Sequence, residues 1–203
     1  MAKPIIAVDI DEVLAAEAEY IIAYSNKHWG HSLTLDDYTE HWAFWGIDNM
    51  DPEFERRADE LHAPGTVSKY RVLPGAKQAL RELAERFELI IVTSRRKRVE
   101  SETRVWLDKN FPGIFSRVIL TGFWDNVDDP SRHLHSKGDI LQDNGVDYLI
   151  DDQVKHCASA TRHGIGAVLF GDYASSHSVA LPDGVTRCKD WEAVRRYFNG
   201  IST

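Results

Sequence analysis

The sequence predicts an α/β fold in which a parallel sheet carries helices on both faces and a helical segment is inserted after the first strand. Three observations indicate this fold. Short, nearly continuous apolar runs such as residues 4–10 (PIIAVDI) have the composition of strands that are buried on both faces. From residue 72 onward, such runs alternate with helical stretches, as in parallel sheets with crossover helices. Between residues 15 and 71, helical stretches follow one another without a convincing strand.

The N-terminal third of the chain is expected to contain one strand and the helical insertion. The elements expected here are strand Pro4–Ile10, helices Ala15–Trp29 and Leu35–Trp42, and a third helix from Pro52. Thr34 and Asp37 have the spacing of a capping box at the start of the second helix. The third helix begins at Asp51-Pro52, with proline at its first helical position. We therefore expect a core of residues 1–14 and 72–203 and a helical domain of residues 15–71.

After residue 72 the alternation becomes regular, and glycine or proline ends most helices. The expected elements are a helix to Arg86, strand Glu88–Thr93, helix Lys97–Asn110, strand Arg117–Thr121, helix Lys137–Asn144, strand Asp147–Ile150, helix Val154–His163, strand Ala167–Phe170 and helix Asp190–Phe198. Residues 123–135 and 171–184 are expected to be long loops.

Composition excludes several classes of protein. The 203 residues carry a net charge of −8 and cluster basic side chains only at Arg95–Arg98, so a nucleic-acid-binding surface is not expected. No run approaches the length of a membrane span, and the N-terminus lacks the pattern of a signal peptide, which favours a cytoplasmic location. Cys157 and Cys188 lack metal-ligand spacing and are expected to be reduced thiols. The sequence does not indicate an oligomeric state.

Acidic, hydroxyl and basic residues follow the predicted strands at the places where ligands bind in such folds. Asp9 and Asp11 follow the first strand, Thr93, Ser94 and Arg95 follow the second predicted strand, and Asp151 and Asp152 follow the apolar run YLI, while Lys137 opens a helix. Because the carboxyl ends of parallel strands share one edge of the sheet, we expect these side chains to meet there. Gathered carboxylates repel one another unless a cation lies among them, so the pattern indicates phosphoryl transfer with a divalent metal ion.

Each residue type suits a step of that chemistry. Asp9 is the candidate nucleophile that would form an aspartyl-phosphate, and Asp11 is the candidate general acid and base. Magnesium prefers hard oxygen ligands, which Asp9, the backbone carbonyl of Asp11 and one of Asp151 and Asp152 would supply. Phosphoryl oxygens would be held by the candidate substrate-binding residues Thr93, Ser94, Arg95 and Lys137. Taken singly, these signals also fit a turn, a helix N-cap or a solvent-exposed lysine.

The order strand-DxD, strand-TS, Lys, strand-DD resembles the signature of the haloacid dehalogenase-like hydrolase superfamily over residues 3–170. The resemblance implies a Rossmann-like doubly wound core, Asp9 as nucleophile, Asp11 as acid and base, Thr93 and Lys137 on the phosphoryl group, and Asp152 on magnesium with Asp151 orienting or assisting the metal site. The helical insertion and the stretch SKGDILQDNGVDYLIDD are similar to the 5′(3′)-deoxyribonucleotidase group, which carries a small helical cap. Relatives commonly have glycine where this chain has Glu12, which would turn outward or alter the turn.

The resemblance implies a magnesium-dependent phosphatase for a small phosphomonoester, with a nucleoside monophosphate as the first expectation. A sugar phosphate or another metabolite is the alternative substrate, and a binding protein with a decayed site is the alternative without catalysis. A receiver-type signalling domain combines similar residues, but in the reverse chain order and without an insertion. The aromatic residues of the insertion (Trp29, Trp42, Phe44 and Trp45) either stack on a base or form the insertion's own core; we expect the core role for most of them.

Overall fold

The computed structural model of the chain describes residues 2–48, 50–125, 135–177 and 179–201. These residues form one six-stranded parallel sheet in the order β3-β2-β1-β4-β5-β6. The strands are β1 Ile5–Val8, β2 Glu88–Thr93, β3 Arg117–Leu120, β4 Tyr148–Asp151, β5 Gly166–Phe170 and β6 Val185–Cys188. The chain first winds from β1 toward β3 and later from β4 toward β6, so the winding direction reverses between β1 and β4. Ligands of such sheets bind beyond the carboxyl ends of the strands at this reversal.

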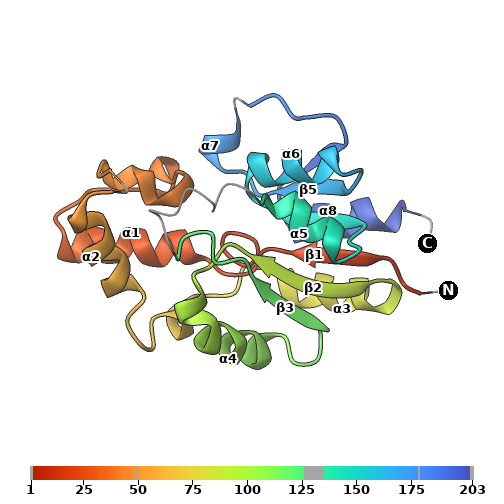
Figure 1. Ribbon diagram of the computed structural model, residues 1–203, viewed down its shortest axis with the longest axis horizontal. Helices are drawn as coiled ribbons and strands as arrows, with labels where there is room; N and C mark the ends of the chain where they lie inside the picture. Colours follow the sequence, from red (N-terminus) through yellow and green to blue (C-terminus); the bar gives the residue numbers. More distant parts are fainter. Residues whose placement is uncertain (1, 49, 126–134, 178, 202–203) are drawn as a thin grey trace.

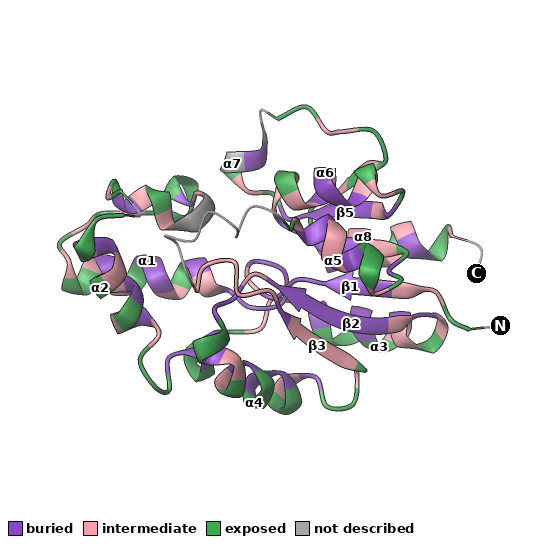
Figure 2. Ribbon diagram, in the orientation of Figure 1, coloured by how far each residue is buried: buried purple, intermediate pink, exposed green. Residues whose placement is uncertain are grey.

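Helices cover both faces of the sheet, as the sequence predicts for a doubly wound fold (Figure 1). One face packs against α3 (Ala76–Arg86), α4 (Glu100–Asn110) and α8 (Trp191–Asn199), whose apolar side chains join one large core cluster. The other face packs against α5 (Lys137–Asp143) and α6 (Val154–Arg162), which contribute to a second cluster. Figure 2 shows β1 and β2 buried almost throughout, while the outer turns of the helices are exposed.

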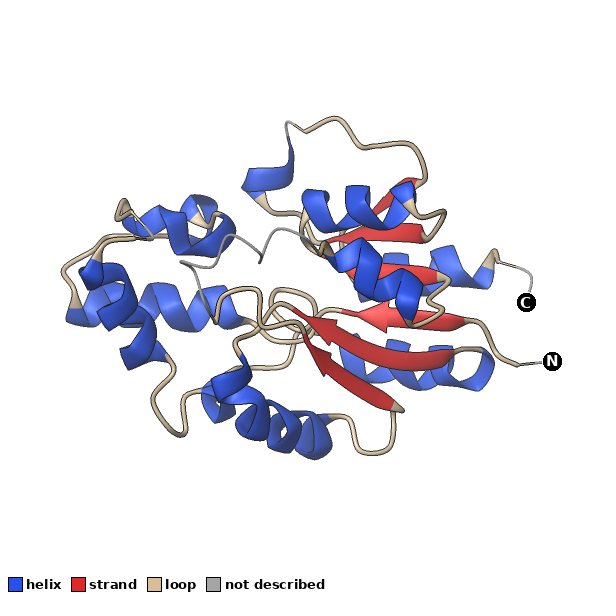
Figure 3. Ribbon diagram, viewed as in Figure 1, coloured by secondary structure: helices blue, strands red, loops and turns tan. Residues whose placement is uncertain are grey.

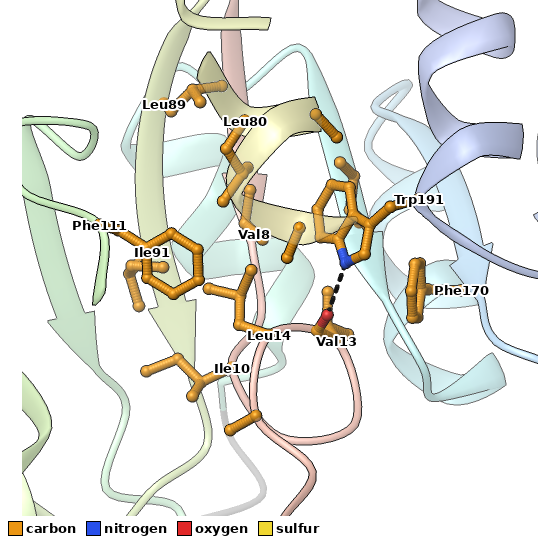
Figure 4. Close-up of a cluster of buried hydrophobic side chains, with 14 of the residues drawn as sticks. Val8, Ile10, Val13, Leu14, Leu80, Leu89, Ile91, Phe111, Phe170 and Trp191 are labelled. Carbon is orange, nitrogen blue, oxygen red and sulfur yellow. Dashed lines mark hydrogen bonds between the residues drawn. The ribbon is translucent and has the colours of Figure 1, made fainter. Parts of the chain in front are cut away.

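The larger core cluster also fixes the turn that follows β1. Leu14 and Ala15 donate backbone hydrogen bonds to the carbonyl of Ile10, at 2.7 and 2.9 Å, so that the chain closes a tight loop just after the strand. The Trp191 indole, which is fully buried, donates a hydrogen bond of 2.9 Å to the carbonyl of Val13 in this loop (Figure 4). The C-terminal helix α8 therefore holds the segment that carries Asp11.

The segment between β1 and α3 lies beyond the carboxyl ends of the strands, toward which the arrowheads point in Figure 3. It consists of α1 (Glu17–His28), the 3₁₀ helices η1 (Leu35–Asp37) and η2 (Glu40–Trp45), α2 (Pro52–Leu61) and η3 (Val67–Lys69). Ile21, Trp45, Phe54 and Leu61 form the centre of an apolar cluster of its own. The two connections to the sheet pair with each other, since Ala16 N–H donates to Arg71 and Leu73 N–H donates to Leu14, both at 2.8 Å.

The structure confirms the predicted fold class and most elements to within two or three residues, and corrects the sequence analysis at two places. The predicted helix Leu35–Trp42 is wrong, because Tyr38 and Thr39 are extended (ψ 125° and 165°) and separate two 3₁₀ helices. Burial of Tyr38 against Tyr173 of the sheet domain favours this path over helix propensity.

The second correction is β6, which pairs with β5 where the sequence analysis expected only a connection before the last helix. Its short sequence VTRC buries only one of four residues fully, so it has no apolar run to identify it. The four-residue helix α7 (Ala174–His177) lies in the expected loop 171–184. Of the loop expected at 123–135, residues 126–134 lie outside the described part. Within the described residues, no helix has both the length and the apolar character needed to cross a membrane.

Candidate active site

The ends of β1 and β4 bring the predicted acidic residues together. Val8 pairs with Ile150 in the parallel register, and Asp9 N–H donates to the carbonyl of Ile150 at 3.0 Å. Carboxylate oxygens of Asp9, Asp151 and Asp152 consequently lie within 4.8 Å of one another, and all three residues are buried. Sequence spacing of 142 and 143 residues separates Asp9 from the other two, so the cluster exists only because the two strands are neighbours.

Lys137 is the cation of this cluster. Its Nζ donates to Asp9 Oδ1 at 2.7 Å and to Asp151 Oδ2 at 2.5 Å, and its side chain is fully buried. The N-terminus of α5 presents it, with Ser136 capping the helix through the Asp139 N–H. The other oxygen of Asp151 accepts the backbone N–H of Gln153 at 2.9 Å, so both of its oxygens are occupied by the protein. Asp151 thus orients Lys137, while Asp152 lies at the cavity described below.

One lysine does not neutralise three buried carboxyl groups, and the pKa values show it. Burial raises the pKa of Asp9 from 3.8 to about 7, although the Lys137 charge opposes this rise. Burial also raises the pKa of Asp151, and it raises that of Asp152 well above its ordinary value, where Asp151 and Asp9 add to the effect. For Lys137, burial alone would lower the pKa, but Asp151 and Asp9 outweigh it and keep the amine charged.

These residues fit a hard divalent cation. A cluster of carboxylate oxygens that retains excess negative charge after its lysine is counted is the donor set that magnesium prefers. Without such a cation, the cluster holds protons near neutral pH, as the raised pKa of Asp9 indicates. Binding of a divalent ion would remove the need for those protons.

Asp11 is turned away from this cluster and toward Arg95. The Arg95 guanidinium, buried at the end of β2, donates to Asp11 through Nε at 2.9 Å and through Nη2 at 2.6 Å. Its Nη1 donates to Thr103 Oγ1 at 3.1 Å, and its plane lies 5.3 Å from the Tyr70 ring centre. A two-point contact of this kind fixes a carboxylate in orientation as well as position. The arginine expected to meet substrate therefore also holds the candidate acid and base.

A cavity of about 130 Å³ opens from the carboxylate cluster toward the helical segment. Its strand-end wall contains the predicted residues Asp9, Asp11, Thr93, Ser94, Arg95 and Asp152. Lys137 and Asp151 lie behind this wall rather than in it, since neither lines the cavity and both are almost completely inaccessible. The structure thus gathers all the predicted site residues at one edge of the sheet, but in two layers.

The helical segment supplies the opposite wall, and its aromatic residues divide into two groups. Trp45 is buried in the segment's own core, where its indole donates to Ser25 Oγ at 3.0 Å, and Trp29 and Phe44 pack around it. Trp42 packs against the same core and also lines the cavity, as do Tyr38 and Phe54, which the sequence analysis did not single out. The core role therefore holds for the predicted aromatics, and Trp42 alone among these four contacts the cavity as well.

Trp42 adopts a backbone conformation that bulky residues avoid. Its φ of 56° lies in the left-handed region, and strain of this kind clusters at functional sites. Its ring lies 5.5 Å from that of His62 and 6.2 Å from that of Phe54, and all three rings line the cavity. The aromatic wall is held in place by the packing of the segment, which offsets the strain.

Ion pairs fasten this wall to the sheet. Arg96, in the loop after β2, donates two hydrogen bonds to Glu55 of α2, at 2.5 and 2.8 Å. Arg98 pairs with Asp59, which lies one turn after Glu55 on α2, and donates to His62 Nδ1 at 2.9 Å. A guanidinium only donates, so His62 Nδ1 accepts and the ring is neutral, consistent with burial lowering its pKa to about 4. The basic cluster at 95–98 therefore connects the two parts of the chain.

Glu12 neither turns outward nor lines the cavity. It is buried at a φ of 55°, which explains why glycine suits this position, and its Oε1 accepts the Ala18 N–H at 2.7 Å in the first turn of α1. Its carbonyl accepts the Tyr173 hydroxyl at 2.8 Å. Burial raises the pKa of Glu12 to about 7. Glu12 is thus a structural bridge between the sheet, α1 and the loop after β5.

Several cavity residues were not found from the sequence. Glu17, His62, Arg96, Trp124, Gln153 and His156 line the cavity together with Tyr38 and Phe54. Most lie on helices or loops without a recognisable motif, and only the tertiary packing of these segments brings them to the site. The one usable signal was Gln153, which follows directly on the Asp151-Asp152 pair.

Comparisons with known proteins identify the family of the chain. The family model described as 5′ nucleotidase, deoxy (Pyrimidine), cytosolic type C protein matches residues 3–198. The chain is 26% identical over 206 residues to a "Putative 5′(3′)-deoxyribonucleotidase" of Staphylococcus epidermidis, with 99% of both chains covered. It is also 26% identical over 190 residues to a "Putative nucleotidase" of Halalkalibacterium halodurans, covering 93% of this chain and 89% of the relative.

Solved structures show the same fold. A haloacid dehalogenase-like family hydrolase from Streptococcus pneumoniae superposes with a TM-score of 0.67 at 15% identity, covering 97% of this chain and 98% of that one. The resemblance to the haloacid dehalogenase superfamily is thereby confirmed, and with it the assignment as a phosphatase-type hydrolase. The chain belongs to the family of 5′ nucleotidases, deoxy (pyrimidine), cytosolic type C, within that superfamily.

Proposed function

We propose that the protein is a magnesium-dependent phosphatase that hydrolyses a nucleoside monophosphate through an aspartyl-phosphate on Asp9. The observation that carries the proposal is the single cavity that joins Asp9 and Asp152 at one end to the rings of Trp42, Phe54 and Trp124. A phosphate at the acidic end would place the attached nucleoside along the aromatic wall. Large rings of this kind stack on planar bases.

In the proposed reaction, a carboxylate oxygen of Asp9 attacks phosphorus, and the bond from phosphorus to the ester oxygen breaks. Asp11 donates a proton to the departing oxygen, so that the nucleoside leaves as a neutral alcohol. Asp11 then accepts a proton from water as the water oxygen attacks the aspartyl-phosphate. This second step releases inorganic phosphate and restores the Asp9 carboxylate. Arg95 holds Asp11 in position for both steps.

Asp9, the backbone carbonyl of Asp11 and Asp152 are the proposed ligands of magnesium, and Asp151 assists the metal site by orienting Lys137. The bound ion would neutralise the carboxylates and the phosphoryl oxygens together. Thr93 and Ser94, which line the cavity, are assigned to the phosphoryl oxygens. Lys137 neutralises Asp9 and Asp151 from behind the cavity wall, and in this proposal its charge acts on the phosphoryl group through Asp9.

Residues 15–71 act in this proposal as a cap that closes the leaving-group side of the cavity, with residues 1–14 and 72–203 as the catalytic core. The alternative substrate is a sugar phosphate, which would use the same acidic end but would gain less from the aromatic wall. Relative hydrolysis rates of matched substrates distinguish the two.

The test is phosphate release from a panel of 5′- and 3′-nucleoside monophosphates, deoxynucleoside monophosphates and sugar phosphates. We expect nucleotides to be hydrolysed with the highest kcat/KM, EDTA to abolish the activity, and magnesium to restore it. Asp9→Asn should abolish turnover, because an amide does not attack phosphorus in place of the carboxylate. Turnover that persists in EDTA or in Asp9→Asn would refute the mechanism, and a preference for sugar phosphates would refute the substrate.

A further inference from the structure

Glu17 is a cavity carboxylate for which the proposed mechanism has no use. It is the first residue of α1, and its partly exposed side chain lines the cavity from the cap side. Burial raises its pKa well above the ordinary value, and the neighbouring Asp11 charge adds to this rise. Arg95 and the Trp42 side chain act on the pKa of Glu17 in the opposite direction. Glu17 lines the same cavity as Asp11 and Trp42. A leaving group would pass this point directly beyond its ester oxygen.

The cations of the cavity are already engaged by carboxylates. Among the described lining residues, Arg95 and Arg96 carry the guanidinium groups. Arg95 is held by Asp11 at 2.6 and 2.9 Å, and Arg96 is held by Glu55 at 2.5 and 2.8 Å. His62 is neutral because it accepts a hydrogen bond from Arg98. A second anionic group on a substrate would therefore lose its hydration at a wall that contains Glu17 and whose arginines are already paired with carboxylates.

From this placement we infer that Glu17 is a specificity-determining residue, which favours leaving groups with a hydrogen-bond donor or positive charge near the phosphate. The inference rests on the proposed function for the position of the phosphate, and it narrows the substrate class. Hydroxyl and amino groups of a nucleoside would donate to the Glu17 carboxyl group. Phosphorylated carboxylic acids and bisphosphates would lose water from their second anionic group without gaining such a partner.

The test uses three alkylphosphonates of similar size that cannot be hydrolysed: 2-aminoethylphosphonate, propylphosphonate and 3-phosphonopropionate. Their binding to the magnesium-loaded protein is measured by calorimetry, which requires no turnover. The wild type should bind the amino compound at least about tenfold more tightly than the carboxylate, since an ammonium group that pairs with a carboxyl group in a partly buried site gains this factor or more. Propylphosphonate should fall between them.

Two variants of Glu17 then locate the origin of the preference. Glu17→Gln should reduce the ratio between amino and carboxylate compounds to about threefold or less, and Glu17→Lys should reverse it. Glu19→Gln is the matched control, because Glu19 lies on the same helix but is exposed and paired with Arg71 at 2.6 Å. It should retain the wild-type ratio. Circular dichroism and thermal unfolding verify that all three variants fold.

The outcomes separate this inference from the proposed function. The role of Glu17 would be overturned by a binding preference that is unchanged in Glu17→Gln and not reversed in Glu17→Lys. It would also be overturned if none of the three compounds bound measurably to either the wild type or Glu17→Lys. Failure of the wild type to hydrolyse any phosphomonoester would overturn the proposed function alone, because the phosphonate series does not depend on turnover. Hydrolysis of phosphoethanolamine, propyl phosphate and phosphoglycolate should follow the order of the phosphonates.

Discussion

Replacing Lys137 with methionine removes the single cation from a buried group of acids. The two hydrogen bonds of Lys137, at 2.7 Å to Asp9 and 2.5 Å to Asp151, are lost, and methionine cannot donate in their place. Breaking a buried ion pair by removing one partner costs about 3–5 kcal/mol in free energy of unfolding, because the remaining charge is uncompensated. For a chain of this length, that cost corresponds to a fall in Tm of roughly 6–20 °C.

The loss depends on pH with a definite sign. Burial already raises the native pKa of Asp9 to about 7, from 3.8, and the loss of Lys137 raises it further. The native state of the variant therefore favours the protonated carboxyl groups, so its stability is retained below pH 4 and is lost as the pH rises through the native pKa. The difference in Tm between wild type and Lys137→Met should be small near pH 5 and largest near pH 8.

The assay is thermal unfolding followed by circular dichroism in EDTA at pH 5, 6.5 and 8, repeated with magnesium. Added magnesium should recover part of the loss at pH 8, since it supplies positive charge to the same carboxylates. Lys77→Met is the matched control, because Lys77 is exposed on α3 and donates a hydrogen bond to Asn110 Oδ1 at 3.4 Å, with no buried carboxylate as its partner in that bond. A Lys137→Met variant as stable as the control at pH 8, or a fall in Tm that does not depend on pH, would refute the reasoning.

Three further predictions concern the metal-free protein, the aromatic wall and the ion pairs of the cap. In EDTA the wild type should be less stable to urea at pH 8 than at pH 6. Burial raises the pKa of Asp9 and Glu12 to about 7, from 3.8 and 4.5, so stability is lost as the pH rises from each ordinary pKa to about 7; the part lost between pH 6 and pH 8 is about 1 kcal/mol for each group, and a urea midpoint that does not change with pH would contradict this. Trp42→Ala should raise KM for a nucleoside monophosphate about tenfold or more, because stacking on an aromatic ring contributes about 1–3 kcal/mol to the binding free energy of a base. KM for propyl phosphate should change little, and equal effects on both substrates would indicate a structural role. Arg96→Gln should raise KM, because α2 loses its ion pair with the loop after β2. The exchanged pair Arg96→Glu with Glu55→Arg should restore KM in steady-state kinetics, and a failure to restore it would exclude this ion pair as the cause of the change in KM.

The sequence by itself determined most of the sheet, its alternation with helices and the chemical types of the candidate site residues. Apolar runs such as β2 identify themselves because a strand buried on both faces needs no polar side chain, and its predicted bounds, Glu88–Thr93, agree with the structure. The order of Asp9, Asp11, Thr93, Lys137 and the Asp151-Asp152 pair predicted one edge of the sheet, because parallel strands all end on the same side. The sequence analysis did not predict strand β6, because an edge strand needs few apolar residues.

Only the tertiary structure decided which partners these residues take. No sequence pattern relates Arg95 to Asp11, Arg96 to Glu55, or Glu17 to the cavity, since each contact joins segments whose distance in space is set by how the helical insertion packs on the sheet. The same packing buried Trp45 and exposed Trp42 to the cavity, although the two aromatics are three residues apart. Local propensity acts over a few residues, whereas burial and ion pairing depend on the whole fold, and so they become visible only in three dimensions.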